Sequence, residues 1–157
     1  MRWSLLLFWF ALCFAVAGLG GRWTSPEIAG WYRTLTRPAI APPNWLFAPV
    51  WTLLYALMAI AAWRITLAPP SPARTLCLTL FVAQLTLNLA WSYIFFHAHA
   101  IAGALFEIVA LWAMIGLCAL SFARIDAPAA GLLAPYWLWV SFATILNAAY
   151  WRLNPST

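Results

Sequence analysis

The chain has 157 residues, of which 66% are hydrophobic and only 7% are charged, and its mean hydropathy is +0.89. Soluble domains carry about 25% charged residues, so this composition excludes an ordinary water-soluble domain, and the apolar content excludes a disordered chain. The net charge of +5 comes from scattered single arginines without any lysine, which offers no basic stripe for a nucleic-acid backbone. We expect a membrane protein whose arginines flank membrane segments, with no nucleic-acid partner.

Charged residues divide the chain into long apolar intervals. Four intervals contain no charged residue, and a further candidate at 101–123 is interrupted only by Glu107. A bilayer core of about 30 Å is crossed by about 20 apolar residues in a helix. We therefore predict an all-α fold, an integral membrane bundle of five transmembrane helices in a single membrane domain, residues 1–157. The predicted helices are about 3–20, 45–65, 74–96, 100–123 and 129–151. Arginines divide equally between the two sides, so the membrane orientation stays open.

The first segment also resembles a secretory signal peptide. Arg2 precedes an apolar run at 5–15, which ends in a small-x-small triplet at 15–17. The bulky Trp3 and Trp9 favour a retained helix instead. The sequence leaves both alternatives open, and N-terminal sequencing of the mature protein distinguishes them.

The connector between the first two helices, about 21–44, is long enough to have structure of its own. Ser25, Pro26 and Glu27 form a helix-start pattern of N-cap, first-turn proline and acidic residue, which predicts a short extra helix over about 26–35. The Pro42-Pro43 pair stiffens the re-entry into the second helix. We expect a semi-rigid lid loop over one end of the bundle; the alternative is an interfacial helix at headgroup level.

Polar and aromatic residues recur at helical spacing on three of the predicted helices, which places each set on one helix face. The three sets are Trp51, Tyr55, Met58 and Ala62; Gln84, Asn88, Trp91, Ser92 and Phe95; and Tyr136, Trp139, Ala143, Leu146, Asn147 and Tyr150. Together the faces could line a flat apolar pocket. Alternatively, the amides hold the helices together and the aromatic residues only pack. Spacing leaves both interpretations open.

Reactive side chains are few. The cysteines are scattered through apolar runs, at Cys13, Cys77 and Cys118. Their number and spacing predict neither a disulfide framework nor a zinc site. His97 and His99 could offer an imidazole to a haem iron or could be solvated loop residues. Glu107 could belong to a proton or ion path, or could reach water or be neutralised by desolvation. We expect no metal site, no required cofactor and no classical hydrolytic or phosphoryl-transfer chemistry.

Three spaced motifs cover nearly the whole chain. The first is Trp31-Tyr32, Leu35, Arg37-Pro38, Pro42-Pro43, Trp45, Phe47, Trp51, Leu54-Tyr55 and Leu57-Met58. The second is Gln84, Asn88, Trp91 and Phe95-Phe96, and the third is Pro135-Tyr136, Trp139, Ala143 and Leu146-Asn147. As a set they resemble the translocator protein family, also called tryptophan-rich sensory proteins or peripheral-type benzodiazepine receptors. The short chain with arginine as its only basic residue type indicates a member from a bacterial membrane.

This resemblance implies a membrane protein that binds tetrapyrroles (porphyrin, haem) and related flat apolar ligands within the bundle, for transport or sensing. It also implies isoquinoline or benzodiazepine-type drugs as ligands, and a homodimer. The pocket residues that it implies are Trp31, Tyr32, Pro42, Trp51, Tyr55, Asn88, Trp91, Ser92, Trp139, Ala143 and Leu146. The chain departs from the family pattern at Ala39, Ile40 and Asn44, so we expect porphyrin carboxylates to be held differently here.

The resemblance leaves other functions open. One is a light-dependent porphyrin-degrading enzyme, in which Trp51 and Trp139 would exchange electrons with the excited macrocycle or quench it. Another is a membrane interaction scaffold whose pocket is vestigial. Leu146, Tyr150 and Arg152 match a loose cholesterol-contact pattern, which chance matches easily in a leucine-rich helix ending in arginine. Whether the chain is an enzyme therefore stays open.

Overall fold

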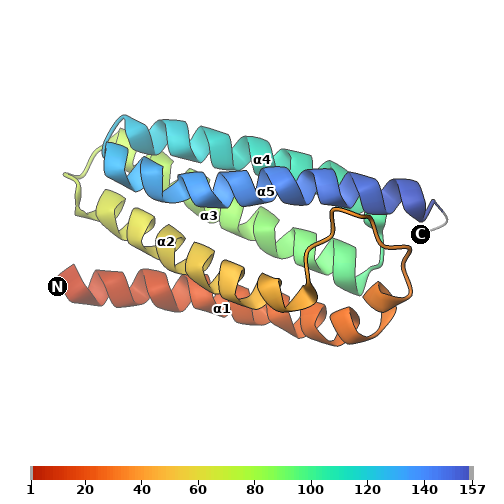
Figure 1. Cartoon of the computed structure of the whole chain (residues 1–157). Coiled ribbons are helices and arrows are strands. Elements are labelled where there is room, and N and C mark those ends of the chain that lie inside the picture. Colours follow the sequence, from red (N-terminus) through yellow and green to blue (C-terminus); the bar gives the residue numbers. More distant parts are fainter. Residues whose placement is uncertain (1, 156–157) are drawn as a thin grey trace.

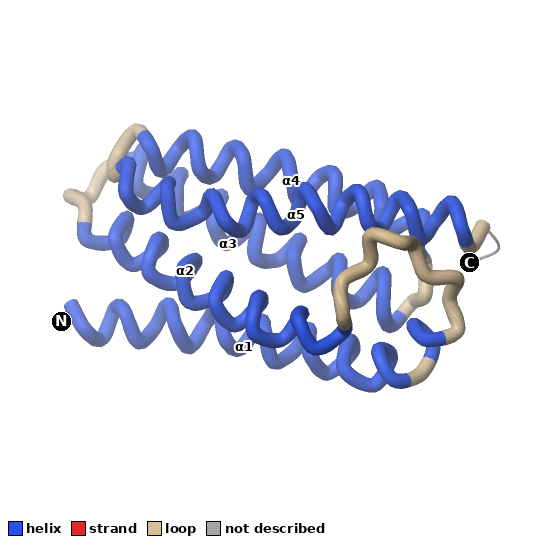
Figure 2. Tube along the Cα trace, in the orientation of Figure 1, coloured by secondary structure: helices blue, strands red, loops and turns tan. Residues whose placement is uncertain are grey.

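The computed structural model describes residues 2–155, and those residues form helices and loops with no strand among them (Figures 1 and 2). The long helices are α1 (Arg2–Ala29), α2 (Phe47–Leu67), α3 (Pro72–Ser92), α4 (Ile101–Ala123) and α5 (Ala127–Leu153). A π-helical turn, Tyr93–His97, extends α3, and 3-10 turns lie at Trp31–Arg33 and Asn44–Leu46. α1 begins at one end of the bundle and α5 ends at the other, as an odd number of spans requires (Figure 1).

All five long helices are long and apolar enough to cross a bilayer. Their outward faces carry large apolar side chains, such as Phe106 on α4 at 78% exposure and Leu138 on α5 at 70%. Such surfaces are stable when lipid covers them, and helices are suited to lipid because they satisfy their own backbone hydrogen bonds. The prediction of a multi-pass membrane protein is confirmed.

The predicted short helix at 26–35 is wrong. α1 continues through Ser25 and Pro26 to Ala29, so Ser25 lies inside a helix and does not cap one. The Gly30 amide still donates to the Pro26 carbonyl at 3.0 Å, after which the chain turns into the 3-10 segment Trp31–Arg33. Tertiary packing overrides the local start signal, because the last turns of α1 cover the bundle interior. The lid is therefore residues 30–46, shorter than the expected 21–44.

α1 packs as an integral part of the bundle. Trp9 and Cys13 are buried, and the Trp9 indole N–H donates to Thr66 Oγ1 on α2 at 2.8 Å. At Gly20 the helix approaches α3 so closely that an added β-carbon would lie 3.3 Å from the Ser92 hydroxyl oxygen. These contacts favour the retained-helix alternative over a signal peptide.

At the end of the bundle away from the lid, the Asp126 carboxylate links two helices. Asp126 Oδ1 accepts the Ala129 amide at 3.1 Å and so caps α5, whose first turn contains Pro128. The Arg64 guanidinium donates to both carboxylate oxygens, with its Nε 3.1 Å from Oδ2. Asp126 thus joins the last turn of α2 to the first turn of α5.

We expect Asp126→Ala to lower the free energy of unfolding by about 1 to 2 kcal/mol, because it removes the helix cap and a partly exposed ion pair. Asp126→Asn keeps an acceptor for the Ala129 amide, so it should cost clearly less. Thermal unfolding of both purified variants in detergent measures the difference. Equal destabilisation by the two substitutions would contradict a dominant role for the cap.

Buried side chains form two clusters. The larger extends through the middle of the bundle and includes Met58, Phe81 and Tyr136. The smaller lies at the lid end and joins Tyr32 of the lid to Phe95 of the π-helical turn. Because side chains from both clusters line the same cavity, the cavity lies between them, with the larger cluster as its floor and the lid-side cluster at its outer end.

Candidate ligand-binding cavity

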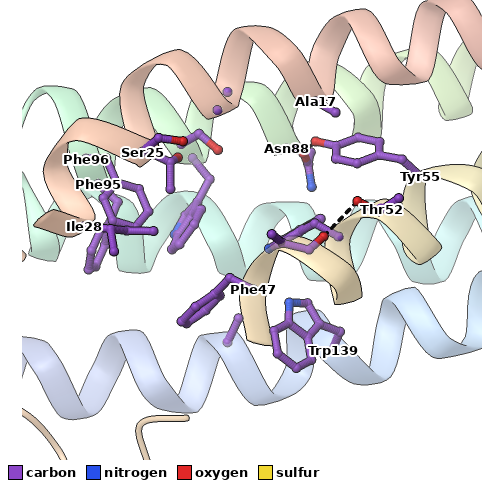
Figure 3. A pocket seen from close by; sticks show the side chains of 18 of the residues that line it. Ala17, Ser25, Ile28, Phe47, Thr52, Tyr55, Asn88, Phe95, Phe96 and Trp139 are labelled. Carbon is purple, nitrogen blue, oxygen red and sulfur yellow. Dashed lines mark hydrogen bonds between the residues drawn. The ribbon is translucent and has the colours of Figure 1, made fainter. Parts of the chain in front are cut away.

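A cavity of about 450 Å³ lies between α1, α2, α3 and α5 at the lid end of the bundle (Figure 3). Its walls are mainly apolar and aromatic, with a few amides and hydroxyls such as Asn88 and Thr52. A volume of this order and such a lining are typical of sites for small organic ligands.

Three tryptophans from three helices form part of this wall: Trp51, Trp91 and Trp139. Trp51 packs on Tyr55, with ring centroids 5.6 Å apart, and Trp139 meets Phe47 edge-to-face at 6.1 Å. Such aromatic pairs fix ring orientation. The wall therefore offers flat, oriented surfaces to an aromatic ligand.

The position of Trp91 is set by a hydrogen-bond chain across three helices. Its indole N–H donates to Asn147 Oδ1 at 3.1 Å, and the Asn147 amide donates to the Ile101 carbonyl at 3.0 Å. Asn147 is 1% exposed, so both bonds lie in the interior, where an unpaired amide would be costly. Asn147 thus holds α3 and α4 to α5 and orients an indole on the cavity wall.

A second chain of hydrogen bonds joins the side chains at the floor of the cavity. The Tyr55 hydroxyl donates to Asn88 Oδ1 at 2.5 Å, and Asn88 Nδ2 donates to the Tyr136 hydroxyl at 3.0 Å. Asn88 also lines the cavity, and Figure 3 shows its side chain beside Tyr55. The protein therefore satisfies the amide without a ligand, which supports the interpretation that Asn88 holds α2, α3 and α5 together.

α1 supplies a wall that the sequence analysis missed. Its cavity-facing residues are mostly small: Ala17, Gly18, Gly20, Gly21, Thr24 and Ser25. A β-carbon added at Gly18 or Gly21 would meet no atom within 4 Å, so small side chains here leave the space open. A signal was present, because residues 17, 21, 24 and 28 recur at helical spacing. This periodicity was overlooked because the first helix was predicted to end at residue 20.

The structure brings nine of the eleven predicted pocket residues onto one cavity wall. They are Tyr32, Trp51, Tyr55, Asn88, Trp91, Ser92, Trp139, Ala143 and Leu146. Trp31 and Pro42 lie outside that wall. Trp31 stacks on the His99 ring at a centroid distance of 4.1 Å, and the Pro42 carbonyl accepts a hydrogen bond from Arg37. Trp31 therefore packs on the α3–α4 turn, the Pro42 carbonyl is bonded within the lid, and neither residue lines the cavity.

Several predicted residues lie deeper than the cavity. Met58 and Tyr136 are fully buried in the larger cluster, and Gln84 is 1% exposed beside the Met58 sulfur. The cholesterol-contact residues face different ways, because Leu146 and Tyr150 point into the bundle while Arg152 is exposed. They therefore offer no common lipid-facing surface.

Neither histidine lines the cavity. His99, at a φ of 54°, places its Nε2 3.0 Å from a Glu27 carboxylate oxygen, and His97 packs against Trp23 and Tyr93. Within residues 2–155 no group of three or more His, Cys, Asp or Glu side chains is placed to hold a metal ion. The Glu107 carboxylate lies off the cavity wall, with both oxygens shielded and without a hydrogen-bond partner among the described residues.

The lid is tied to the end of α5. The Thr36 amide donates to Asn154 Oδ1 at 2.9 Å, and Asn154 Nδ2 returns a hydrogen bond to the Thr36 carbonyl at 3.1 Å. Within the lid, the Ala41 amide donates to the Pro38 carbonyl at 3.0 Å. These bonds hold the lid across the outer end of the bundle, as its course in Figure 2 shows.

We expect Pro42→Gly with Pro43→Gly to weaken ligand binding by about 1 kcal/mol, because glycine restores backbone freedom that the lid must lose when it closes. The bundle itself should stay folded. Titration of the purified double variant with protoporphyrin measures the affinity, and circular dichroism checks the helices. An unchanged affinity in a folded variant would show that lid rigidity does not matter for binding.

A five-span membrane bundle with an aromatic cavity beneath a lid at one end is the class that this fold and site define. The model of the TspO/MBR family matches residues 9–152, and the chain belongs to this family. It is 43% identical over 146 residues to the "Tryptophan-rich protein TspO" of Chlorobaculum tepidum, an alignment that covers 92% of each chain.

Other relatives extend the comparison. The "Protein CrtK" of Rhodobacter capsulatus is 39% identical over 155 residues, covering 97% of this chain and 95% of the relative. The "Translocator protein" of Bos taurus is 35% identical over 138 residues, covering 87% and 82%. The resemblance predicted from the three motifs is confirmed, and the two bacterial relatives agree with a bacterial membrane protein.

Proposed function

We propose that this protein binds tetrapyrroles such as porphyrin and haem, and related flat apolar ligands, in the cavity beneath the lid, for transport or sensing. The single observation that carries the proposal is the convergence of Trp51, Trp91 and Trp139 on a cavity of about 450 Å³. A planar macrocycle gains most from flat aromatic walls because dispersion and aromatic contacts grow with the area that is brought together.

The small residues of α1 make this proposal testable by filling the cavity. Gly21→Phe places a ring in space that is open now, whereas Gly131→Phe places the same ring at an open position on α5 outside the cavity. We expect Gly21→Phe to weaken protoporphyrin binding about tenfold or more, since overfilled space costs on the order of 1 to 3 kcal/mol. Gly131→Phe should bind like the unmodified protein.

Binding is measured on protein in lipid nanodiscs by the porphyrin absorbance shift and by quenching of tryptophan fluorescence. If Gly21→Phe and Gly131→Phe both bind with unchanged affinity, the ligand does not occupy this cavity. If the unmodified protein binds no protoporphyrin at all, a membrane interaction scaffold becomes the better description.

A second candidate function is light-dependent breakdown of a bound porphyrin. The observation in its favour is that Trp51 and Trp139, the residues expected to serve it, lie on the same cavity wall. Illumination of the purified complex should then bleach the porphyrin absorbance, and Trp51→Phe with Trp139→Phe should slow that loss relative to the amount bound. Bleaching that is the same without protein would eliminate this candidate. Binding of isoquinoline or benzodiazepine-type drugs and a homodimer remain predictions.

A further inference from the structure

A second pocket of about 460 Å³ adjoins the main cavity beneath the lid. The two pockets share Ile28, Tyr32 and Tyr150, so these side chains form the boundary between them. The second pocket differs in chemistry because Arg33, Arg37 and Asn44 line it, and no acidic residue is among its lining residues. An apolar compartment therefore adjoins a positively charged one.

Neither arginine is neutralised within the described part of the chain. The ion pairs found there are Arg64 with Asp126, at the opposite end of the bundle, and His99 with Glu27. Arg33 and Arg37 are both exposed, and one Arg37 nitrogen donates to the Pro42 carbonyl. Guanidinium groups without carboxylate partners are suited to bind a carboxylate on a ligand, because their N–H groups match its two oxygens.

The Asn44 side chain is a further polar group that points to a ligand at this pocket. Asn44 Oδ1 is shielded from solvent and has no hydrogen-bond partner among the described residues. A ligand O–H could satisfy that oxygen, and rotation of the amide would present N–H donors to a carboxylate instead. Burial, and then the hydrogen bond to the Tyr150 hydroxyl, raise the pKa of Tyr32, whereas the charge of Arg37 lowers it. The Arg37 charge therefore acts at the boundary between the two pockets.

We infer that one amphipathic ligand spans both pockets, with its apolar ring among the tryptophans and an acidic side chain at Arg33 and Arg37. This inference rests on the proposed function and adds to it the two arginines that hold a carboxylate of the ligand. The boundary residues Tyr32 and Tyr150 suit such a ligand, because each combines an apolar ring with a hydroxyl group. A neutral compound of the same ring uses only the apolar cavity.

Protoporphyrin IX and its dimethyl ester test the inference, because they share one ring and differ only in the charge of two side chains. In nanodiscs of neutral phosphatidylcholine, the acid should bind about tenfold more tightly than the ester, the scale of one charge-assisted hydrogen bond. Added salt should reduce the preference because the arginines are exposed. In Arg33→Gln with Arg37→Gln, affinity for the acid should fall to that for the ester, and affinity for the ester should stay unchanged.

Arg152→Gln is the matched control, because Arg152 lies at the same end of the bundle and lines neither pocket. It should keep the full preference for the acid. Equal binding of acid and ester by the unmodified protein would overturn the inference while leaving the proposed function intact. A double variant that loses the ester as well as the acid would also overturn it, because the arginines would then act through lid structure. A protein that binds neither compound overturns the proposed function and the inference together.

A lipid headgroup is the competing occupant of the charged pocket. In that case Arg33→Gln with Arg37→Gln would lower binding of phosphatidylglycerol and leave the ratio of acid to ester affinity unchanged. That result would contradict the inference.

Discussion

Asn88→Leu is expected to lower the stability of the bundle more than any other single amide replacement on α3. The substitution removes both the acceptor of the Tyr55 hydroxyl and the donor to Tyr136, and each hydroxyl is on a buried residue. We expect a loss of about 2 kcal/mol, because polar groups are left unpaired in the interior, although such losses are smaller in membrane proteins than in soluble ones. Thermal unfolding in detergent measures the change.

Thr86→Leu is the control for this variant. Thr86 lies on the same helix and is exposed, and its hydroxyl bonds only to the Val82 carbonyl of its own helix. Its replacement should leave the unfolding temperature nearly unchanged. Affinity for protoporphyrin separates the two roles of Asn88: a large loss of affinity with unchanged stability would show that Asn88 serves the ligand and not the helix contacts.

Long apolar intervals were sufficient to predict the helices. Every predicted span corresponds to a helix, and the second to fifth agree with the structure to within a few residues. The agreement follows because lipid keeps charged side chains rare within a span, with Glu107 in α4 as the exception. The first span was predicted too short. Its limit was set before Arg22, and Ser25 to Glu27 were interpreted as the start of a separate helix. A helix can, however, carry charged residues beyond the apolar core of the membrane, and α1 continues to Ala29.

Helical spacing predicted which face of each helix is inward, but it could not predict how deep the cavity reaches. Gln84, Asn88 and Trp91 share one face of α3, yet Gln84 is buried in the core while Asn88 and Trp91 line open space. Depth depends on the size of side chains on the opposing helix. On α1 the side chains near the lid are glycine and alanine, which leave a cavity open, whereas the larger Trp9 and Cys13 further along fill the core. Which of these side chains opposes which residue of α3 is known only after the helices are packed.

The sequence predicted where the lid lies along the chain but not the path that the lid follows. Its proline pair and the Trp31-Tyr32 pair were correctly placed between the first two helices, but hydrogen bonds to a distant segment decide its path. Thr36 and Asn154 are separated by most of the chain, and no local pattern marks them as partners. The same limit applies to the charged pocket, since Asn44 and Tyr150 meet Arg33 only through the fold.

Trp139→Ala is expected to weaken protoporphyrin binding by about 2 kcal/mol, or roughly thirtyfold, because it removes most of the α5 indole surface from the cavity wall. Trp139→Phe keeps an aromatic ring, so its loss should be smaller. Trp139 packs edge-to-face on Phe47 at the start of α2, and the bundle core lies below it, so the helices should stay folded. Titrations followed by porphyrin absorbance measure both variants.

Trp112→Ala is the matched control for this prediction. Trp112 lies on α4, its indole N–H donates to Ser141 Oγ at 2.7 Å, and it does not line the cavity. Removing it takes away as much aromatic surface as Trp139→Ala but none of the proposed ligand contact, so affinity should be unchanged. If Trp112→Ala lowers protoporphyrin affinity while Trp139→Ala keeps it, the ligand binds on the α4 side of the bundle, and the cavity assignment fails although the fold stands.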